Sequence, residues 1–166
     1  MRITDLLKAC SVELNGTPQT KEETIEQMVA LMEKGGNVTD VEKYKAGVFA
    51  REEEGTTGIG EGIAIPHAKT DAVNAPGLAA MVIPAGVDYD ALDGQPVDLV
   101  FLIAAPNTED NVHLEVLSRL SMLLMDESFK QNLLKAKTVE QFLAVVDRAE
   151  NAKNEAEEEK AVNVPD

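Results

Sequence analysis

The longest apolar run of this sequence is Val97-Asp98-Leu99-Val100-Phe101-Leu102-Ile103, continued by Ala104-Ala105-Pro106, and Asp98 interrupts it. A nearly continuous apolar run of this length predicts a strand that is buried on both faces of a sheet. A second run, Leu78-Ala79-Ala80-Met81-Val82-Ile83, predicts a similar strand. Both runs fall well short of the ~20 apolar residues that span a bilayer. The chain is therefore expected to fold around a buried sheet, without direct membrane insertion.

Helical patterns lie on both sides of these strands. Two capping boxes, Thr20-Lys21-Glu22-Glu23 and Thr39-Asp40-Val41-Glu42, predict helices that end near Gly35 and Glu54. After Pro106, apolar spacing predicts three more helices, over residues 110–125, 128–136 and 138–149. Shorter strands are expected at residues 12–14 and 63–65, and a short strand or turn at residues 87–89. This order favours a layered α/β fold with a mixed sheet.

The length of 166 residues fits one domain over residues 1–150, followed by an acidic polar stretch over residues 151–166. That stretch is rich in Glu, Ala and Asn and has almost nothing to bury. We therefore expect a solvated linker there, leading to further domains in the native chain.

Charge and cysteine content narrow the choice of partners and compartment. The net charge of −15 at pH 7 argues against nucleic acid or an anionic membrane surface as the main partner, because both attract basic proteins. Cys10 is the only cysteine and cannot form an internal disulfide, and the N-terminus lacks the apolar stretch of a secretory signal. These features favour a cytoplasmic protein.

A glycine-rich run, Gly58-Ile59-Gly60-Glu61-Gly62-Ile63-Ala64-Ile65-Pro66, leads into His67. A neutral imidazole nitrogen can attack phosphorus and form a covalent phosphohistidine. The glycines would let backbone amides approach a phosphate group. The same pattern also suits an ordinary turn. No Gly-Lys-Ser/Thr and no Gly-x-Gly-x-x-Gly occurs in the run, so ATP and NAD are not expected as cofactors.

Two further residues are candidates for the same site. His113 lies in the first turn of the helix predicted from residue 110, where backbone amides and the helix dipole favour an anion. It could equally be a partly buried histidine bound to a carbonyl group. Arg51, near the end of the helix predicted before Gly55, could neutralise phosphoryl oxygens or form a solvated ion pair. The two histidines are 46 positions apart and form no His-x-x-x-His pair. They provide too few ligands for a zinc site, so no metal is expected.

These segments together resemble a known family. Glu52, six further residues and then Ile59 to Ala68 resemble the signature of enzyme II A domains of the mannitol/fructose class, from the bacterial phosphoenolpyruvate-dependent sugar phosphotransferase system. The resemblance covers about residues 2 to 148. It includes Gly86-Val87-Asp88-Tyr89, Leu92-Asp93-Gly94 and His113-Leu114. It implies a three-layer α/β/α sandwich with a mixed β-sheet flanked by helices.

The resemblance also implies roles for the candidate residues. His67 would accept phosphate from the phosphocarrier protein HPr and pass it to a cysteine of an enzyme II B domain, while a II C membrane domain transports the sugar. His113 would stabilise the phosphoryl group, and Arg51 its charge. Ala68 after His67 is similar to fructose-type members, whereas regulatory nitrogen-related members often carry Pro-His-Gly. A regulatory protein acting by phosphorylation-dependent binding is the alternative. Glu61 stands where many members carry asparagine.

Overall fold

The strand that begins at Val97 is the centre of the sheet. The computed structural model describes residues 2–162, and all statements of structure below refer to that range. In it, β6 (Val97–Pro106) lies antiparallel to β5 (Gly77–Val87) and parallel to both β3 (Ile63–Ala64) and β4 (His67–Thr70). The edges are β1 (Leu7–Glu13), parallel to β5, and β2 (Gly58–Gly60), antiparallel to β3. The sheet is therefore mixed.

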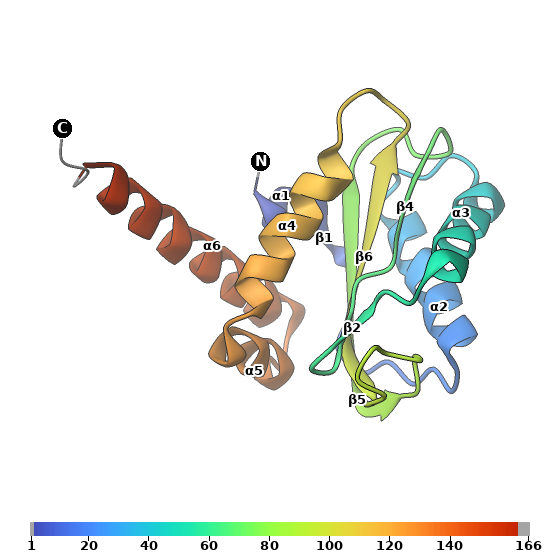
Figure 1. The fold of residues 1–166 in the computed structure, drawn as a ribbon, viewed down its shortest axis with the longest axis horizontal. Coiled ribbons are helices and arrows are strands. Elements are labelled where there is room, and N and C mark those ends of the chain that lie inside the picture. Colours follow the sequence, from blue (N-terminus) through green and yellow to red (C-terminus); the bar gives the residue numbers. More distant parts are fainter. Residues whose placement is uncertain (1, 163–166) are drawn as a thin grey trace.

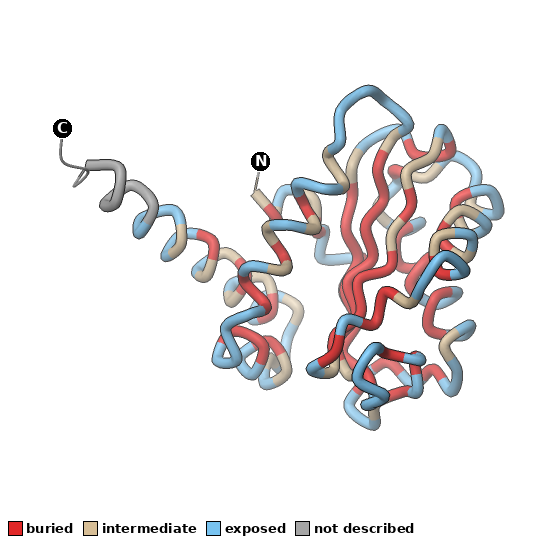
Figure 2. Tube along the Cα trace, viewed as in Figure 1, coloured by how far each residue is buried: buried red, intermediate tan, exposed pale blue. Residues whose placement is uncertain are grey.

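Helices cover both faces of this sheet (Figure 1). One face carries α2 (Lys21–Lys34) and α3 (Val41–Glu54). The other carries α1 (Ile3–Leu6), α4 (Val112–Leu124), α5 (Glu127–Lys135) and the first part of α6 (Val139–Val162). Figure 2 shows the strands as a buried layer between helices whose outer surfaces are exposed. The three-layer α/β/α sandwich expected from the sequence is confirmed.

The side chains of β6 point alternately to the two faces of the sheet, and this explains why helices cover both faces. Every residue of β6 except Asp98 and Pro106 is buried. Successive side chains of a strand point to opposite faces, so Val100 and Leu102 pack toward α2 and α3. Leu99, Phe101 and Ile103 pack toward α4. Both faces of the strand are apolar, so each must be buried under a layer of helices.

The capping boxes place the helix starts to within one residue. Thr20 caps α2, as predicted, by accepting a hydrogen bond from the Glu23 amide at 3.1 Å. The N-cap of α3 is Asp40 rather than Thr39. The reason is that the Thr39 hydroxyl donates to the Ala72 carbonyl at 3.0 Å and is not directed at the helix.

The C-terminal segment differs from the expected linker. Residues 151–162 continue α6 as helix, which projects away from the body in Figure 1. The side chains of residues 151–156 are exposed or only partly buried. The helix predicted over residues 138–149 thus runs further than expected. Ala, Glu and Lys are strong helix formers, so they continue the helix without burying a face. Residues 163–166 of the predicted linker lie outside the described residues.

The close approach of Gly58 to Ala91 gives a test of the packing. A Cβ at Gly58 would lie 2.8 Å from the Ala91 Cα, whereas one at Gly47 in α3 would lie 3.4 Å from the Ala68 Cβ. We expect Gly58→Ala to lower the free energy of unfolding by about 1–3 kcal/mol through overpacking against backbone. Gly47→Ala should raise it by about 0.5–1 kcal/mol through helix propensity. Urea denaturation measures both changes, and an undiminished stability of Gly58→Ala would contradict the packing described.

Candidate functional site

His67 is the first residue of β4 and lies against the end of β6. Its register partner is Ile103, whose amide donates to the Pro66 carbonyl at 3.0 Å. Ala68 packs toward α2 and α3, and Ile65 packs toward α4. Because successive strand residues alternate in direction, the half-buried His67 faces the α4 side. The buried strand β6 therefore fixes the backbone of the histidine beside the loop that leads into α4.

A hydrogen bond to the backbone sets the state of the His67 ring. Its Nδ1 lies 3.0 Å from the Ile65 carbonyl oxygen. A carbonyl oxygen can only accept, so Nδ1 carries the proton in this contact. In the neutral ring the other nitrogen, Nε2, then keeps its lone pair. The geometry thus leaves Nε2 as the ring nitrogen of His67 with a free lone pair.

His113 is brought next to His67, as predicted. It is the second residue of α4, and the centroids of the two imidazole rings are 6.4 Å apart with the planes tilted by 30°. The Nδ1 atom of His113 is buried and has no hydrogen-bond partner among the described residues. Burial lowers the pKa of His113, and the positive charges that a protonated His67 would carry and that Lys69 carries lower it further. The neutral form of His113 is therefore favoured at pH 7.

The start of α4 offers positive potential beside the two rings. Its N-cap residue, Asn111, makes no side-chain hydrogen bond to the first turn, and the Asn111 Oδ1 instead accepts from the Lys69 ammonium at 3.5 Å. The first amides of a helix have no acceptor within the helix, and the dipole makes this end positive. A phosphoryl group on Nε2 of His67 would therefore meet a favourable field.

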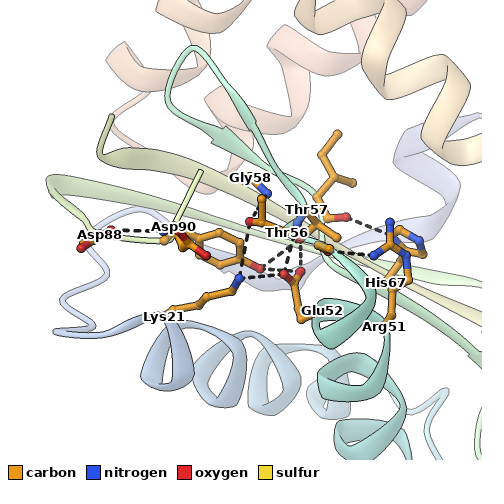
Figure 3. Close-up of polar contacts among 12 residues, drawn as sticks. Lys21, Arg51, Glu52, Thr56, Thr57, Gly58, His67, Asp88 and Asp90 are labelled. Atoms are coloured by element: carbon orange, nitrogen blue, oxygen red, sulfur yellow. Dashed lines mark hydrogen bonds and ion pairs between the residues drawn. The ribbon is translucent and has the colours of Figure 1, made fainter. Parts of the chain in front are cut away.

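Arg51 lies in the last turn of α3, on a helix that covers the opposite face of the sheet. Its Nη1 donates to the Gly55 carbonyl at 2.9 Å. Within the described residues its guanidinium makes no hydrogen bond to His67 or His113. In the view of Figure 3 its side chain extends from α3 in the direction of His67. The structure thus places the two histidine rings beside each other, and Arg51 is bonded to the loop that follows its own helix.

The end of the glycine-rich run forms the turn between β2 and β3. Glu61 and Gly62 make up this turn, and Gly60, Glu61 and Gly62 have positive φ values. The beginning of the run lies nearer to the histidine, because Gly58 pairs with Ala64 and the Thr57 carbonyl accepts from the Ile65 amide. The expectation that amides of this run approach a phosphate group stays a prediction. Glu61 is exposed, and its amide donates to the Asp93 carboxylate at 3.0 Å.

Glu52, to which the sequence patterns assigned no role, carries a buried carboxylate near the end of α3 (Figure 3). Glu52 accepts hydrogen bonds from the Thr57 amide at 3.1 Å, from the Thr57 hydroxyl and from the Tyr89 hydroxyl at 3.0 Å. The Lys21 ammonium lies 3.0 Å from the second carboxylate oxygen and 4.8 Å from the centre of the Tyr89 ring. Burial, aided by the charge of Glu52, raises the pKa of Tyr89 far above its ordinary value. Tyr89 therefore remains a hydrogen-bond donor.

The burial of Glu52 could have been predicted from the sequence. Glu52 is followed directly by Glu53 and Glu54, and such a run is usually solvated. However, the buried residues of α3 that contact the sheet side are Tyr44, Val48 and Glu52, which recur every four positions. This spacing places Glu52 on the inward stripe of the helix.

Two further observations concern the described residues as a whole. No group of three or more His, Cys, Asp and Glu side chains there is placed so that it could hold a metal ion. None of the helices there combines the length and the apolar character that crossing a membrane requires.

The fold and the paired histidines point to one class of protein, the enzyme II A domains. The family model described as phosphoenolpyruvate-dependent sugar phosphotransferase system, EIIA 2, matches residues 5–149. The chain belongs to this family, and the resemblance seen in the sequence is confirmed.

Fructose-specific proteins are among its relatives. The chain is 45% identical over 148 residues to the fructose-specific EIIABC component of Bacillus subtilis, and the match covers 89% of this chain and 23% of that protein. It is 41% identical over 152 residues to the fructose-specific EIIA component of Haloferax volcanii, covering 88% of this chain and 99% of that protein. The chain therefore spans about a quarter of the first relative and nearly all of the second.

Solved structures of the same fold include regulatory and transport proteins. The nitrogen regulatory protein IIA-Ntr from Neisseria meningitidis matches with a TM-score of 0.80 and 30% identity, over 86% of this chain and 97% of that one. Enzyme IIAMTL from Escherichia coli, solved in complex with phosphorylated enzyme IIBMTL, matches with a TM-score of 0.74 and 31% identity, over 86% and 99% of the chains.

The lowered pKa of His113 predicts a pH dependence of stability. In the unfolded chain its pKa returns to about 6.5, so below that pH the unfolded state takes up the proton more readily. The stabilisation is fully present above about pH 6.5 and is lost as the pH falls through the folded pKa. We expect the unfolding free energy of the wild type to fall more steeply between pH 7 and pH 5 than that of His113→Gln. Urea denaturation across this range tests it, and parallel curves would contradict the lowered pKa.

Proposed function

We propose that this chain is a phosphohistidine carrier that accepts a phosphoryl group on Nε2 of His67 from phosphorylated HPr. It then passes the group to a cysteine of an enzyme II B domain. The observation that carries the proposal is the hydrogen bond from His67 Nδ1 to the Ile65 carbonyl, 3.0 Å long, which leaves Nε2 as the free nucleophile beside neutral His113. The chain is thus a phosphotransferase component that acts together with partner domains.

The transfer needs little chemistry from the protein beyond positioning. The Nε2 lone pair attacks phosphorus in line as the bond from phosphorus to HPr breaks, and the electron pair of that bond stays with HPr. The product keeps its proton on Nδ1, so the hydrogen bond to Ile65 persists. In the second step a cysteine thiolate attacks phosphorus, the N–P bond breaks, and its electron pair returns to Nε2. We assign His113, Arg51 and the start of α4 to stabilising charge on the phosphoryl oxygens.

Family membership supports the partners and the sugar. The solved complex of enzyme IIAMTL with phosphorylated enzyme IIBMTL supports a II B domain as the acceptor. The two fructose-specific relatives, at 45% and 41% identity, support fructose or a related sugar. Uptake would be completed by a II C membrane domain, and the carrier would act in the cytoplasm. The sugar itself never contacts His67 in this scheme.

The division into domains belongs to the same proposal. Residues 1–150 form the carrier domain, and the helical extension after residue 150 connects it to further domains in the native chain. The name of the Bacillus subtilis relative, an EIIABC component of which this chain spans 23%, supports such an arrangement. The downstream coding sequence tests it directly, since a following II B domain would bring its reactive cysteine.

A regulatory role is the second candidate function. It is favoured by the nitrogen regulatory protein of Neisseria meningitidis, whose fold matches with a TM-score of 0.80. In that case the phosphorylation state would control binding to a partner protein, and no cysteine would receive the group. Transfer from the phosphorylated chain to a purified fructose II B domain separates the two functions.

Incubation with phosphorylated HPr should add one acid-labile phosphate per chain. His67→Ala should remove this label completely, because the acceptor nitrogen is gone. The label is measured by intact-mass spectrometry before and after brief acid treatment. An unchanged label in His67→Ala would contradict the proposed function.

His113→Gln provides the matched control for this experiment. It removes the neighbouring ring but keeps the His67 nucleophile, so labelling should persist while transfer to the II B cysteine slows. Wild-type transfer in His113→Gln would show that the second ring has a structural role only.

A further inference from the structure

A continuous path of hydrogen bonds connects buried Glu52 with the His67 ring (Figure 3). The Glu52 carboxylate accepts from the amide and the hydroxyl of Thr57. The Thr57 carbonyl accepts from the Ile65 amide at 3.0 Å. The Ile65 carbonyl in turn accepts the Nδ1 proton of His67 at 3.0 Å. The end of α3 is thereby linked to the beginning of β4 through Thr57 and Ile65.

The carboxylate at the start of this path is held from several directions. Its side chain is only 5% exposed. One oxygen accepts from the Tyr89 hydroxyl at 3.0 Å, and the other lies 3.0 Å from the Lys21 ammonium. The donors come from α2, from the segment before β2 and from the loop after β5. A buried carboxylate is tolerated only when its oxygens are paired in this way, so the position of Glu52 is narrowly defined.

Stability alone does not account for a carboxylate at this place. Tyr44 and Val48 lie on the same buried stripe of α3. Apolar residues in place of both Glu52 and its ion-pair partner Lys21 would anchor the helix without the cost of burying charge, and replacement of a whole buried ion pair is often neutral or stabilising. A carboxylate offers what an apolar side chain cannot, namely two acceptor oxygens that set the direction of the Thr57 amide and hydroxyl.

We propose that Glu52 is a positioning residue that orients both His67 and Arg51 for phosphoryl transfer. By holding Thr57, it holds the Ile65 carbonyl where it keeps the proton on Nδ1 and aims Nε2 toward α4. Arg51 directly precedes Glu52 in the last turn of α3. The bonds that hold Glu52 therefore also fix the backbone position from which the Arg51 side chain extends. This inference rests on the proposed function of His67 as the phosphoryl acceptor.

The test uses the two variants Glu52→Gln and Thr57→Val. Gln directs an amide group at the surrounding donors, and Val removes the hydroxyl while it leaves both backbone bonds of the path. The ¹⁵N chemical shifts of the imidazole report which nitrogen of His67 is protonated, and they need no partner protein. Rates of transfer from phosphorylated HPr give kcat and KM. In Glu52→Gln we expect a mixture of His67 tautomers and a kcat that is lower by about tenfold to a hundredfold, with KM unchanged.

Ser11→Ala is the matched control for lost stability. The Ser11 hydroxyl is buried in β1, at the far edge of the sheet, and donates to the Leu31 carbonyl at 2.8 Å. Its removal breaks a buried hydrogen bond outside the path. Ser11→Ala should therefore keep the wild-type kcat and the wild-type tautomer of His67, even where its unfolding midpoint falls as far as that of Glu52→Gln.

A wild-type tautomer together with a wild-type kcat in Glu52→Gln would overturn the inference, and so would an equal fall of kcat in Ser11→Ala. If Glu52→Gln does not fold, Thr57→Val carries the same two measurements, with a smaller shift in the same direction expected. A wild-type chain that accepts no phosphoryl group would refute the proposed function instead. The ¹⁵N measurement would still decide whether Glu52 sets the state of the His67 ring.

Discussion

The parallel pairing of β4 with β6 is the constraint on which the site depends. β6 is buried on both faces, so neither its position nor its register can shift without exposing apolar surface. His67 is paired with Ile103 of this strand. On the same face of the sheet, Val116 and Leu120 of α4 pack into the apolar cluster that contains Ile103. The packing that holds α4 therefore also brings His113 to His67.

The electrostatics around His67 suit an anionic group. Burial favours the neutral form of His113, and Arg51 donates to the Gly55 carbonyl. The start of α4 and the Lys69 ammonium, which donates to Asn111, supply positive potential. Under the proposed function these groups would stabilise the charge of a phosphoryl group on Nε2.

The sequence predicted the parts of the site that follow from local pattern. The apolar runs predicted the buried strands and with them the layered fold. The short loop after Pro106 predicted that His113 lies in the first turn of α4. How near the glycine-rich run lies to His67 depends on the pairing of β2 with β3 and of β3 with β6, which no local pattern contains. The helix through the polar stretch after residue 150 was not predicted, since low hydrophobicity excludes a buried face but not a helix. Glu52 was hidden in an acidic run, although its spacing from Tyr44 and Val48 placed it on the buried stripe.

The most direct test of the account identifies the atom that carries phosphorus. The chain, labelled with ¹⁵N-histidine, is phosphorylated by phosphorylated HPr, and the coupling between ³¹P and ¹⁵N is recorded by NMR. Because Nδ1 of His67 donates to the Ile65 carbonyl, we expect coupling to Nε2 of His67 alone. Coupling to Nδ1 of His67, or to either nitrogen of His113, would contradict it.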